Sequence, residues 1–240
     1  MPPATQSAAA PSHVGIIMDG NGRWAQARGL SRSEGHRAGA GPVRTILKAA
    51  HREGVRHLTL YAFSTENWAR SDEEVGNLFA LLAEYLDSET AELLASGVRL
   101  SAMGALDRLP SFARQALSEA MKATAGNDDL TLTLALSYGS RAELAAATRA
   151  LAEKVKSGAL APEEIDEARL AGQLWSADLP DLDLLIRTGG ERRVSNFMLW
   201  QLAYAELLFT DTLWPDFGEA DFLAALADFQ GRRRRFGRAE

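Results

Sequence analysis

The feature that most constrains the fold of this chain is a regular alternation of short strand-like and longer helix-like stretches. The apolar runs predict buried strands over residues 13–18, 56–63, 98–103, 130–136 and 183–186. Apolar residues at helical spacing predict helices over residues 23–29, 33–54, 72–96, 111–125, 141–156, 162–175 and 218–232. Gly39, Gly41 and Pro42 are positioned to interrupt the second helix. Such alternation predicts an α/β fold, with a mainly parallel central sheet covered by helices on both faces.

The chain is long enough to bury a sizeable core as one domain, with 240 residues and 46% hydrophobic content. Its interior has no linker, repeat or low-complexity stretch, so we expect a single domain over residues 13–240. Residues 1–12 are rich in Ala, Pro and Ser and lack the features of a signal peptide, which predicts a disordered tail. With no membrane-length apolar run and no cysteine, we expect a soluble cytoplasmic protein without disulfides or thiol catalysis.

The net charge of −6 argues against nucleic acid as the main partner, because nucleic-acid-binding surfaces are usually broadly basic. Positive charge is instead concentrated in the stretch that follows the first strand. Between Asp19 and Arg44, five arginines stand against two acids. A basic patch on an acidic protein suits a small polyanionic ligand. A pair of solvated helix faces explains the same charges.

The first strand ends in a polar loop, Asp-Gly-Asn-Gly-Arg-Trp, at residues 19–24. Gly20 and Gly22 let backbone N–H groups approach anionic oxygens, and Arg23 adds a forked cation. Asp19 is suited to hold a divalent metal ion. The loop therefore fits a phosphorylated ligand bound together with a metal, although a strand followed by Asp-Gly also begins many ordinary turns.

A second polar cluster, Ser-Thr-Glu-Asn-Trp-Ala-Arg, follows the second strand at residues 64–70. It offers donors for diphosphate oxygens and an aromatic wall for an apolar group. Ser71 and Glu74 have the spacing of a helix capping box, which explains part of the cluster but not its amide, indole and guanidinium groups. Parallel strands gather their carboxyl ends at one edge, so we expect this cluster to share a cleft with the first.

The third cluster, at residues 187–196, has two glycines flanked by arginines, an arrangement suited to cradling an anion. It contains neither a Walker lysine motif nor a dinucleotide fingerprint, so nucleotide binding is weakly supported. Glu206 lies farther on in a strongly apolar context, where a carboxylate is costly unless it is paired or bound to a metal. A structural salt bridge and a metal site beside Asp19 both remain open for it.

The expected long helix at residues 72–96 carries an apolar stripe that core packing explains. Leu81 and Tyr85 broaden the stripe beyond one core face, which would suit a helix beside an apolar channel. Among the histidines, His36 has a phosphate-friendly setting between glycine and arginine, whereas the other three look structural.

Together, residues 13–24, 32–39, 61–70, 186–206 and the Arg-Phe-Gly sequence at 235–237 resemble the cis-prenyltransferase family. The resemblance runs in order over almost the whole chain. It implies Mg²⁺-dependent, sequential addition of isopentenyl diphosphate to an allylic primer, usually farnesyl diphosphate, with each new double bond cis. It also implies a hydrophobic tunnel for the product. The small residue Ala62, just before the second cluster, resembles the medium- and long-chain members of the family, whereas short-chain members have a bulkier residue there. We therefore expect undecaprenyl diphosphate, the lipid carrier precursor for cell-wall synthesis, as the product.

The resemblance implies that Asp19 and Asn67 are catalytic and that Asp19 and Glu206 coordinate Mg²⁺. The substrate-binding residues that it implies are Gly20, Asn21, Gly22, Arg23, Trp24, Arg32, His36, Ser64, Thr65, Glu66, Trp68, Arg70, Arg187, Arg193, Val194 and Ser195. It further implies a homodimer in which residues 235–237 complete the neighbouring site, and peripheral membrane contact for product release.

Two positions depart from the family pattern, because Ser137 and Ser140 stand where the family often has Asn and Gly, and no role is carried over to them. A shorter or longer product is an alternative within the family. A non-catalytic partner subunit is another, although such subunits lose the loop that is intact here at residues 19–23. A phosphoryl-transfer enzyme with the same anion cradles is a third.

Overall fold

The computed structural model describes residues 10–232 of the chain. Most of the expected N-terminal tail, residues 1–9, and the C-terminal motif at residues 235–237 lie outside the described residues. Within the described residues, a hydrogen bond fixes the backbone at Ser12, one residue before the first strand. The N–H of Ser12 donates to the Asp183 carboxylate at 2.9 Å.

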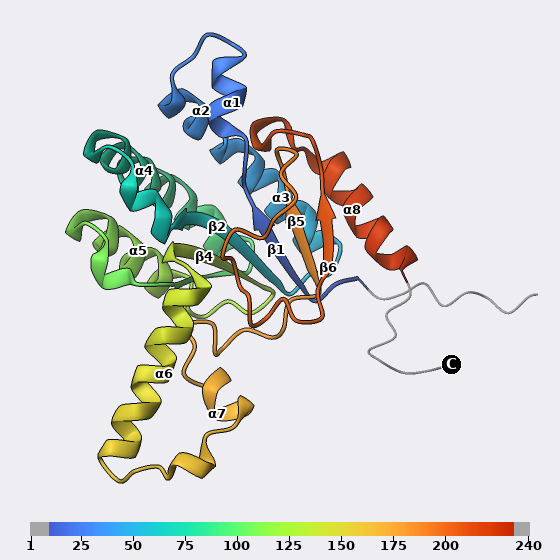
Figure 1. Cartoon of the computed structure of the whole chain (residues 1–240). Helices are drawn as coiled ribbons and strands as arrows, with labels where there is room; N and C mark the ends of the chain where they lie inside the picture. The colour runs from blue at the N-terminus through green and yellow to red at the C-terminus, as the bar shows by residue number, and fades with distance from the viewer. Residues whose placement is uncertain (1–9, 233–240) are drawn as a thin grey trace, which may run out of the picture.

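A single six-stranded parallel sheet of order β3-β4-β2-β1-β5-β6 forms the centre of the described residues (Figure 1). Its strands are β1 (His13–Ile17), β2 (His57–Ser64), β3 (Val98–Met103), β4 (Leu130–Tyr138), β5 (Leu184–Arg187) and β6 (Glu206–Phe209). The predicted α/β fold is confirmed. Strand β6 was not predicted from the sequence, because it has only four residues, lies at the sheet edge and begins at an acid.

The helices connect the strands as expected for right-handed crossovers. They are α1 (Asn21–Gln26), α2 (Arg32–Ala38), α3 (Ala40–Arg52), α4 (Asp72–Ala95), α5 (Ser111–Ala123), α6 (Ser140–Lys156), α7 (Glu167–Ala171) and α8 (Glu219–Gly231). The expected helix over residues 33–54 is divided at Gly39. The prediction of one helix over residues 162–175 is wrong. The Asp166 side chain accepts a hydrogen bond from the N–H of Arg169, and it thereby caps the start of the short helix α7.

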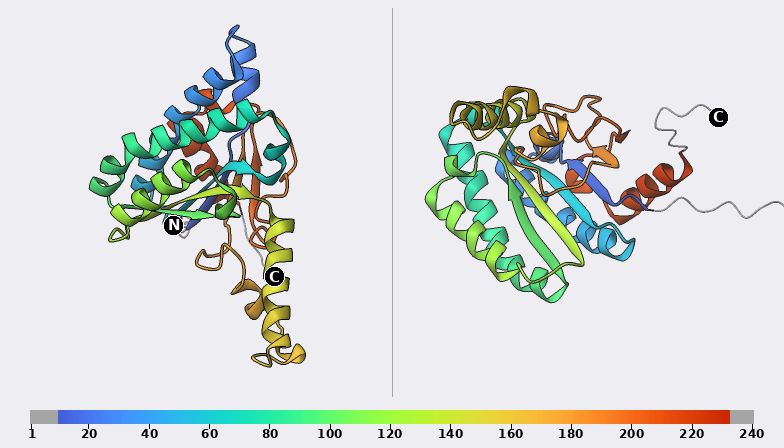
Figure 2. Two further views of the ribbon diagram at one scale, coloured as in Figure 1. Left: turned by 90° about the vertical axis from the view of Figure 1, so that its left-hand side faces the viewer. Right: turned by 90° about the horizontal axis from the view of Figure 1, so that it is seen from below.

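The two faces of the sheet are covered differently (Figure 2). The larger core lies between one face and helices α3, α4, α5 and α8, and it includes fully buried Leu58, Leu132 and Phe222. A smaller core on the other face contains Tyr138 and Phe197, from β4 and an irregular segment. Helices α6 and α7 extend away from this side of the sheet (Figure 2).

Strand register brings the polar clusters to one edge of the sheet. Ile17, the last residue of β1, pairs with Arg187, the last residue of β5. Strand β2 runs parallel to β1 on its other side and ends at Ser64. The loops after these three strands therefore start side by side, as the sequence predicted.

His13 is buried at the opposite, amino end of the sheet. Its ring nitrogens lie 2.8 Å from the Pro180 carbonyl oxygen and 2.8 Å from Thr59 Oγ1. Burial lowers the pKa of His13 to about 4, so the ring is neutral in the folded protein at pH 7. The unfolded chain, with an ordinary histidine pKa near 6.5, binds a proton more readily between these two values.

We therefore expect the free energy of unfolding to fall as the pH drops below about 6.5, reaching a loss on the order of 2 kcal/mol from His13 by pH 5. Urea denaturation at pH 7.5 and pH 5 should reveal this loss in the wild type and a smaller one in His13→Gln. His51→Gln, on the exposed side of α3, is the matched control and should retain the wild-type pH dependence. An identical pH dependence in His13→Gln and the wild type would contradict the prediction.

Candidate active site

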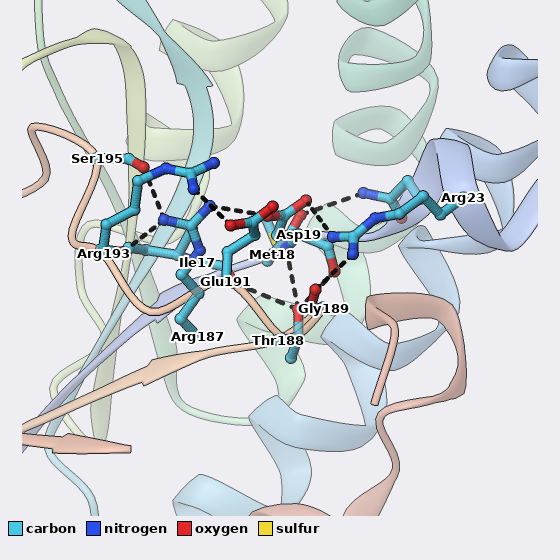
Figure 3. Close-up of polar contacts among 11 residues, drawn as sticks. Ile17, Met18, Asp19, Arg23, Arg187, Thr188, Gly189, Glu191, Arg193 and Ser195 are labelled. Carbon is cyan, nitrogen blue, oxygen red and sulfur yellow. Dashed lines mark hydrogen bonds and ion pairs between the residues drawn. The ribbon is translucent and has the colours of Figure 1, made fainter. Parts of the chain in front are cut away.

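Asp19 joins the first and third polar clusters at the carboxyl edge of the sheet (Figure 3). Its Oδ2 accepts a hydrogen bond from Arg187 at 2.8 Å, and its Oδ1 accepts one from Arg23 at 3.3 Å. The Arg187 side chain is only 4% exposed, whereas that of Asp19 is 31% exposed. The buried guanidinium thus holds the carboxylate, while the carboxylate still faces the open side of the loop.

The backbone around this ion pair is tied together as well. The N–H of Asp19 donates to Thr188 Oγ1 at 2.9 Å, and the Thr188 hydroxyl donates to the Asp19 carbonyl oxygen at 2.7 Å. Arg23 donates to the carbonyl oxygen of Gly189 at 2.6 Å. Gly189 has φ +83°, and a Cβ there would lie 2.6 Å from the Arg23 guanidinium. Only glycine fits between the two loops.

Arg187 also organises the loop that follows it. It donates to Ser195 Oγ at 2.7 Å and to the carbonyl oxygen of Arg193. Arg193 itself pairs with Glu191 at 2.5 Å and is exposed. Ser195 and its neighbour Asn196 adopt left-handed backbone conformations, with φ of 44° and 60°. Such conformations in residues other than glycine persist only where surrounding contacts enforce them, and they are common at functional sites.

Asn196 connects this loop to the second cluster. Its side-chain amide donates to Glu66 at 3.0 Å, and its Oδ1 accepts from the N–H of Arg141 at the start of α6. A Cβ on Gly139 would lie 2.5 Å from Thr65 Oγ1, so these segments approach closely. All three sequence clusters therefore meet at one edge.

Within the second cluster, Asn67 folds back on its own loop, where its Oδ1 accepts from the N–H of Ser64 at 3.0 Å. The Trp68 indole donates to Ser137 Oγ at 2.9 Å, and its ring packs against Phe63 and Phe79 with centroids 5.1 and 5.5 Å away. Trp68 therefore supports two aromatic residues that line the apolar cavity described below.

A basic pocket of about 580 Å³ opens beside Asp19. Its walls come from the first loop, α1, α2 and the end of the second cluster: Met18, Asp19, Gly20, Asn21, Gly22, Arg23, Gln26, Gly29, Leu30, Arg32, His36 and Arg70. Glu74 of α4 lies 2.9 Å from Arg70 and 3.4 Å from Arg32, so one carboxylate holds two of these arginines.

Glu74 forms only half of the predicted capping box. Its backbone N–H donates to Ser71 Oγ at 3.2 Å, but its carboxylate turns to the arginines. The spacing of Ser71 and Glu74 predicted a capping role for the Glu74 side chain. In the structure, the carboxylate instead pairs with Arg70 and with Arg32 of α2. Thr188, Asn196 and Glu74 are site residues that were not predicted, although the first two stand inside the third motif.

His36 lies where the basic pocket meets an apolar cavity. Burial, aided by the positive charges of Arg70 and Arg32, lowers the pKa of His36 to about 4. The ring is therefore neutral at pH 7. Its buried Nε2 has no hydrogen-bond partner within residues 10–232.

The apolar cavity, of about 200 Å³, lies between the sheet and helices α3 and α4. It shares Met18, Asn21, His36 and Arg70 with the basic pocket, so the two spaces adjoin. Its remaining walls are Gly39, Ala40, Val43, Leu60, Tyr61, Ala62, Phe63, Asn67, Leu78, Phe79, Leu81, Leu82, Tyr85, Leu134, Leu136 and Trp214. The predicted apolar channel beside the long helix is present, with Leu81 and Tyr85 in its wall.

Comparison with known proteins identifies the group to which this arrangement belongs. Residues 17–237 match the family described as putative undecaprenyl diphosphate synthase. The chain belongs to the cis-prenyltransferase family. It is 52% identical over 95% of its length to an isoprenyl transferase of Geobacillus kaustophilus, covering 88% of that protein. It is 51% identical over 96% of its length to a farnesyl-diphosphate-specific ditrans,polycis-undecaprenyl-diphosphate synthase of Xanthomonas axonopodis pv. citri, covering 90% of that enzyme.

Solved structures agree with this assignment. Lavandulyl diphosphate synthase from Lavandula x intermedia, in complex with dimethylallyl diphosphate, superposes with a TM-score of 0.93 at 41% identity over 96% of this chain and 99% of that one. A probable undecaprenyl diphosphate synthase from Campylobacter jejuni gives 0.78 at 34% identity, over 95% of this chain and 99% of its own. The fold of this prenyltransferase is thus that of its relatives.

Two predicted site residues of this prenyltransferase lie elsewhere. Trp24 lines neither space, because its indole donates to Asp216 at 2.6 Å and Arg28 stacks on it at 4.1 Å. Glu206 begins β6, at the amino end of the sheet, where it pairs with Arg232 at 2.8 Å. Strands run in one direction from this end toward Asp19, so a single chain does not bring the two predicted metal ligands together.

The remaining predicted residues surround the site at its edge. Val194 is half-buried against the smaller core, and Ser64 and Thr65 bound the second cluster. Within residues 10–232 there is no group of three or more His, Asp or Glu side chains arranged to hold a metal ion.

Gly35 of α2 lets this helix pack closely against Asn21, which lines the basic pocket. A Cβ on Gly35 would overlap the backbone oxygen of Asn21, whereas a Cβ on Gly41 would meet nothing within 4 Å. We expect Gly35→Ala to weaken binding of inorganic diphosphate about tenfold, because α2 must move away from the first loop. Gly41→Ala is the matched control and should bind as the wild type does. Calorimetric titration measures both, and equal affinities in the two variants would contradict this role for Gly35.

Proposed function

We propose that this chain is a Mg²⁺-dependent cis-prenyltransferase that condenses isopentenyl diphosphate units onto farnesyl diphosphate to make undecaprenyl diphosphate. The observation that carries the proposal is the junction of an arginine-lined pocket with an apolar cavity, at His36 and Arg70. An allylic diphosphate has the same two parts, an anionic head and a hydrocarbon chain. The names of the relatives support the same substrate class.

The basic pocket fits the diphosphate of the primer. Breaking the bond between carbon and diphosphate develops negative charge on the leaving group, and preorganised cations stabilise that charge. Arg23, Arg32 and Arg70 supply positive charge around the pocket, and neutral His36 offers a hydrogen-bonding nitrogen. This chemistry needs no protein nucleophile, which agrees with a chain that has no cysteine.

The third cluster fits the diphosphate of the condensing unit. Arg187, Arg193 and Ser195 lie on the far side of Asp19 from the basic pocket, joined to it through the Asp19 carboxylate. In this arrangement the two substrates meet above Asp19, with Asn67 at the mouth of the apolar cavity. An amide is a poor base, so we assign Asn67 an orienting role in proton loss and the proton itself to a diphosphate oxygen of the substrate.

Asp19 fits a magnesium ion. Mg²⁺ is usually bound through one or two carboxylates together with substrate phosphates and water, and Asp19 offers one partly exposed carboxylate in the wall of the basic pocket. When bound, the ion neutralises charge on the departing diphosphate. Arg23 and Arg187 hold the carboxylate in place for it.

We further propose a homodimer, with residues 13–240 as one catalytic domain. The β6 edge supports this, because it is unpaired within the described sheet and Leu207 and Tyr204 are 39% and 71% exposed there. Within residues 10–232, no helix is long and apolar enough to cross a membrane. A cytoplasmic location, membrane contact during product release and a role in cell-wall synthesis stay predictions.

Incubation of the purified chain alone with farnesyl diphosphate, labelled isopentenyl diphosphate and Mg²⁺ tests the activity. Chromatography should show products lengthened in five-carbon steps, with release of inorganic diphosphate, and a chelator should stop the reaction. Absence of elongation would favour a non-catalytic subunit. Release of inorganic phosphate in place of diphosphate would favour phosphoryl transfer.

Asp19→Asn should lower turnover by roughly 10²-fold or more, because the neutral amide loses the metal and its ion pair with Arg187. Asp178→Asn removes an exposed carboxylate remote from the two pockets and is the matched control. Steady-state rates at saturating Mg²⁺ measure both variants, with thermal melts to compare folding. Near-normal turnover in Asp19→Asn would overturn the role assigned to Asp19.

A further inference from the structure

A buried carboxylate lies in the wall of α4, away from the diphosphate pocket. Glu89 is 4% exposed and stands one turn beyond Tyr85. Arg44 of α3 donates its Nε to one Glu89 oxygen at 2.9 Å and a terminal nitrogen to the other oxygen. A carboxylate buried beside apolar residues is costly unless it is paired in this way, and the catalytic chemistry above does not use it.

This ion pair lies just past the deep end of the apolar cavity. Val43 and Tyr85 line that end, one from α3 and one from α4. One turn farther along the same two helices, Leu47 and Glu89 line a second groove of about 350 Å³. The Arg44–Glu89 pair therefore stands between two hollows that run along the same helix pair.

One polar group at the boundary between the two hollows lacks a hydrogen-bond partner among the described residues. The Tyr85 hydroxyl is buried and has no hydrogen-bond partner within residues 10–232. Burial raises the pKa of Tyr85, and the nearby charge of Glu89 raises it further. A buried hydroxyl without a partner is unusual in a native structure, and this one lies one helical turn from Glu89.

The second groove is suited to hold an apolar chain that extends beyond the end of the cavity. Its floor includes buried Leu47, Leu93 and Val98, and its rim carries charged side chains of both signs. The apolar cavity, at about 200 Å³, is smaller than the roughly 300–1,000 Å³ of pockets that enclose drug-sized ligands. A prenyl chain that lengthens step by step needs more room than this cavity offers.

We propose that the Arg44–Glu89 ion pair is a latch that closes the deep end of the cavity and limits how far the product chain grows. When α3 and α4 separate at the pair, the chain passes Tyr85 and continues over Leu47 and Leu93. The inference rests on the proposed function for its natural ligand, but the closure itself is a property of the two helices.

A series of n-alkyl phosphates tests the closure without turnover. Affinity should rise roughly fourfold for each added methylene that is buried, then stop rising at the length where the chain meets the latch. The double variant Arg44→Met/Glu89→Gln removes both charges and leaves no unpaired carboxylate. Its affinity should continue to rise beyond the wild-type limit. Equal limits in the two proteins would overturn the latch.

Product analysis tests the consequence for catalysis. The double variant should yield products at least one five-carbon unit longer than the wild type, at similar rates of isopentenyl diphosphate use. The single variant Arg44→Lys keeps the positive charge beside Glu89, so its products should have the wild-type length. Arg37→Met breaks the exposed Arg37–Glu84 pair, 2.6 Å apart between α2 and α4, and is the matched control with unchanged products, because this pair lines neither the apolar cavity nor the second groove.

The outcomes separate the latch from the proposed function. No elongation by the wild type refutes the proposed function, while the alkyl phosphate series still decides the closure. Elongation with one product length in all variants refutes the latch. If the double variant does not fold, as judged by circular dichroism, Glu89→Gln alone replaces it in both tests. This single variant weakens the ion pair and introduces no new charge, so we expect the same lengthening of bound alkyl chain and product.

Discussion

The ion pair between Asp19 and Arg187 is the interaction on which the rest of the site depends. It joins the last residue of β5 to the second residue after β1, and these two parallel strands are neighbours in the sheet. The guanidinium is almost fully buried, so it cannot move without exposing an unpaired charge to the core. From this fixed point, Arg187 positions Ser195, and Asp19 in turn positions Arg23.

A second constraint comes from the meeting of two unlike environments. The arginines of the basic pocket need water or anions around them, whereas most of the cavity wall consists of aliphatic and aromatic side chains. His36 stands at the junction and stays neutral because burial and its arginine neighbours disfavour its charged form. A neutral imidazole ring can lie beside both the arginines of the basic pocket and the apolar wall of the cavity. The molecule can therefore bind a ligand that is anionic at one end and hydrocarbon at the other.

The latch proposed at Arg44 and Glu89 extends the same logic to the far end of the cavity. An apolar wall ends a tunnel only through the bulk of its side chains, because apolar contacts are non-directional. A bidentate ion pair has a fixed geometry and breaks as a unit. It can thus hold α3 and α4 in a fixed relative position at the end of the cavity.

The sequence by itself determined the α/β alternation, most strand positions and the three polar clusters, because local apolar periodicity and motif chemistry are written in consecutive residues. It did not determine β6, the short α7 or the position of Glu206, which depend on sheet order and strand direction. Only the tertiary structure decided that Glu74 holds two arginines and that Glu89 faces Arg44. These partners are distant in the chain, and their pairing follows from how helices pack on a twisted sheet, which no local pattern encodes.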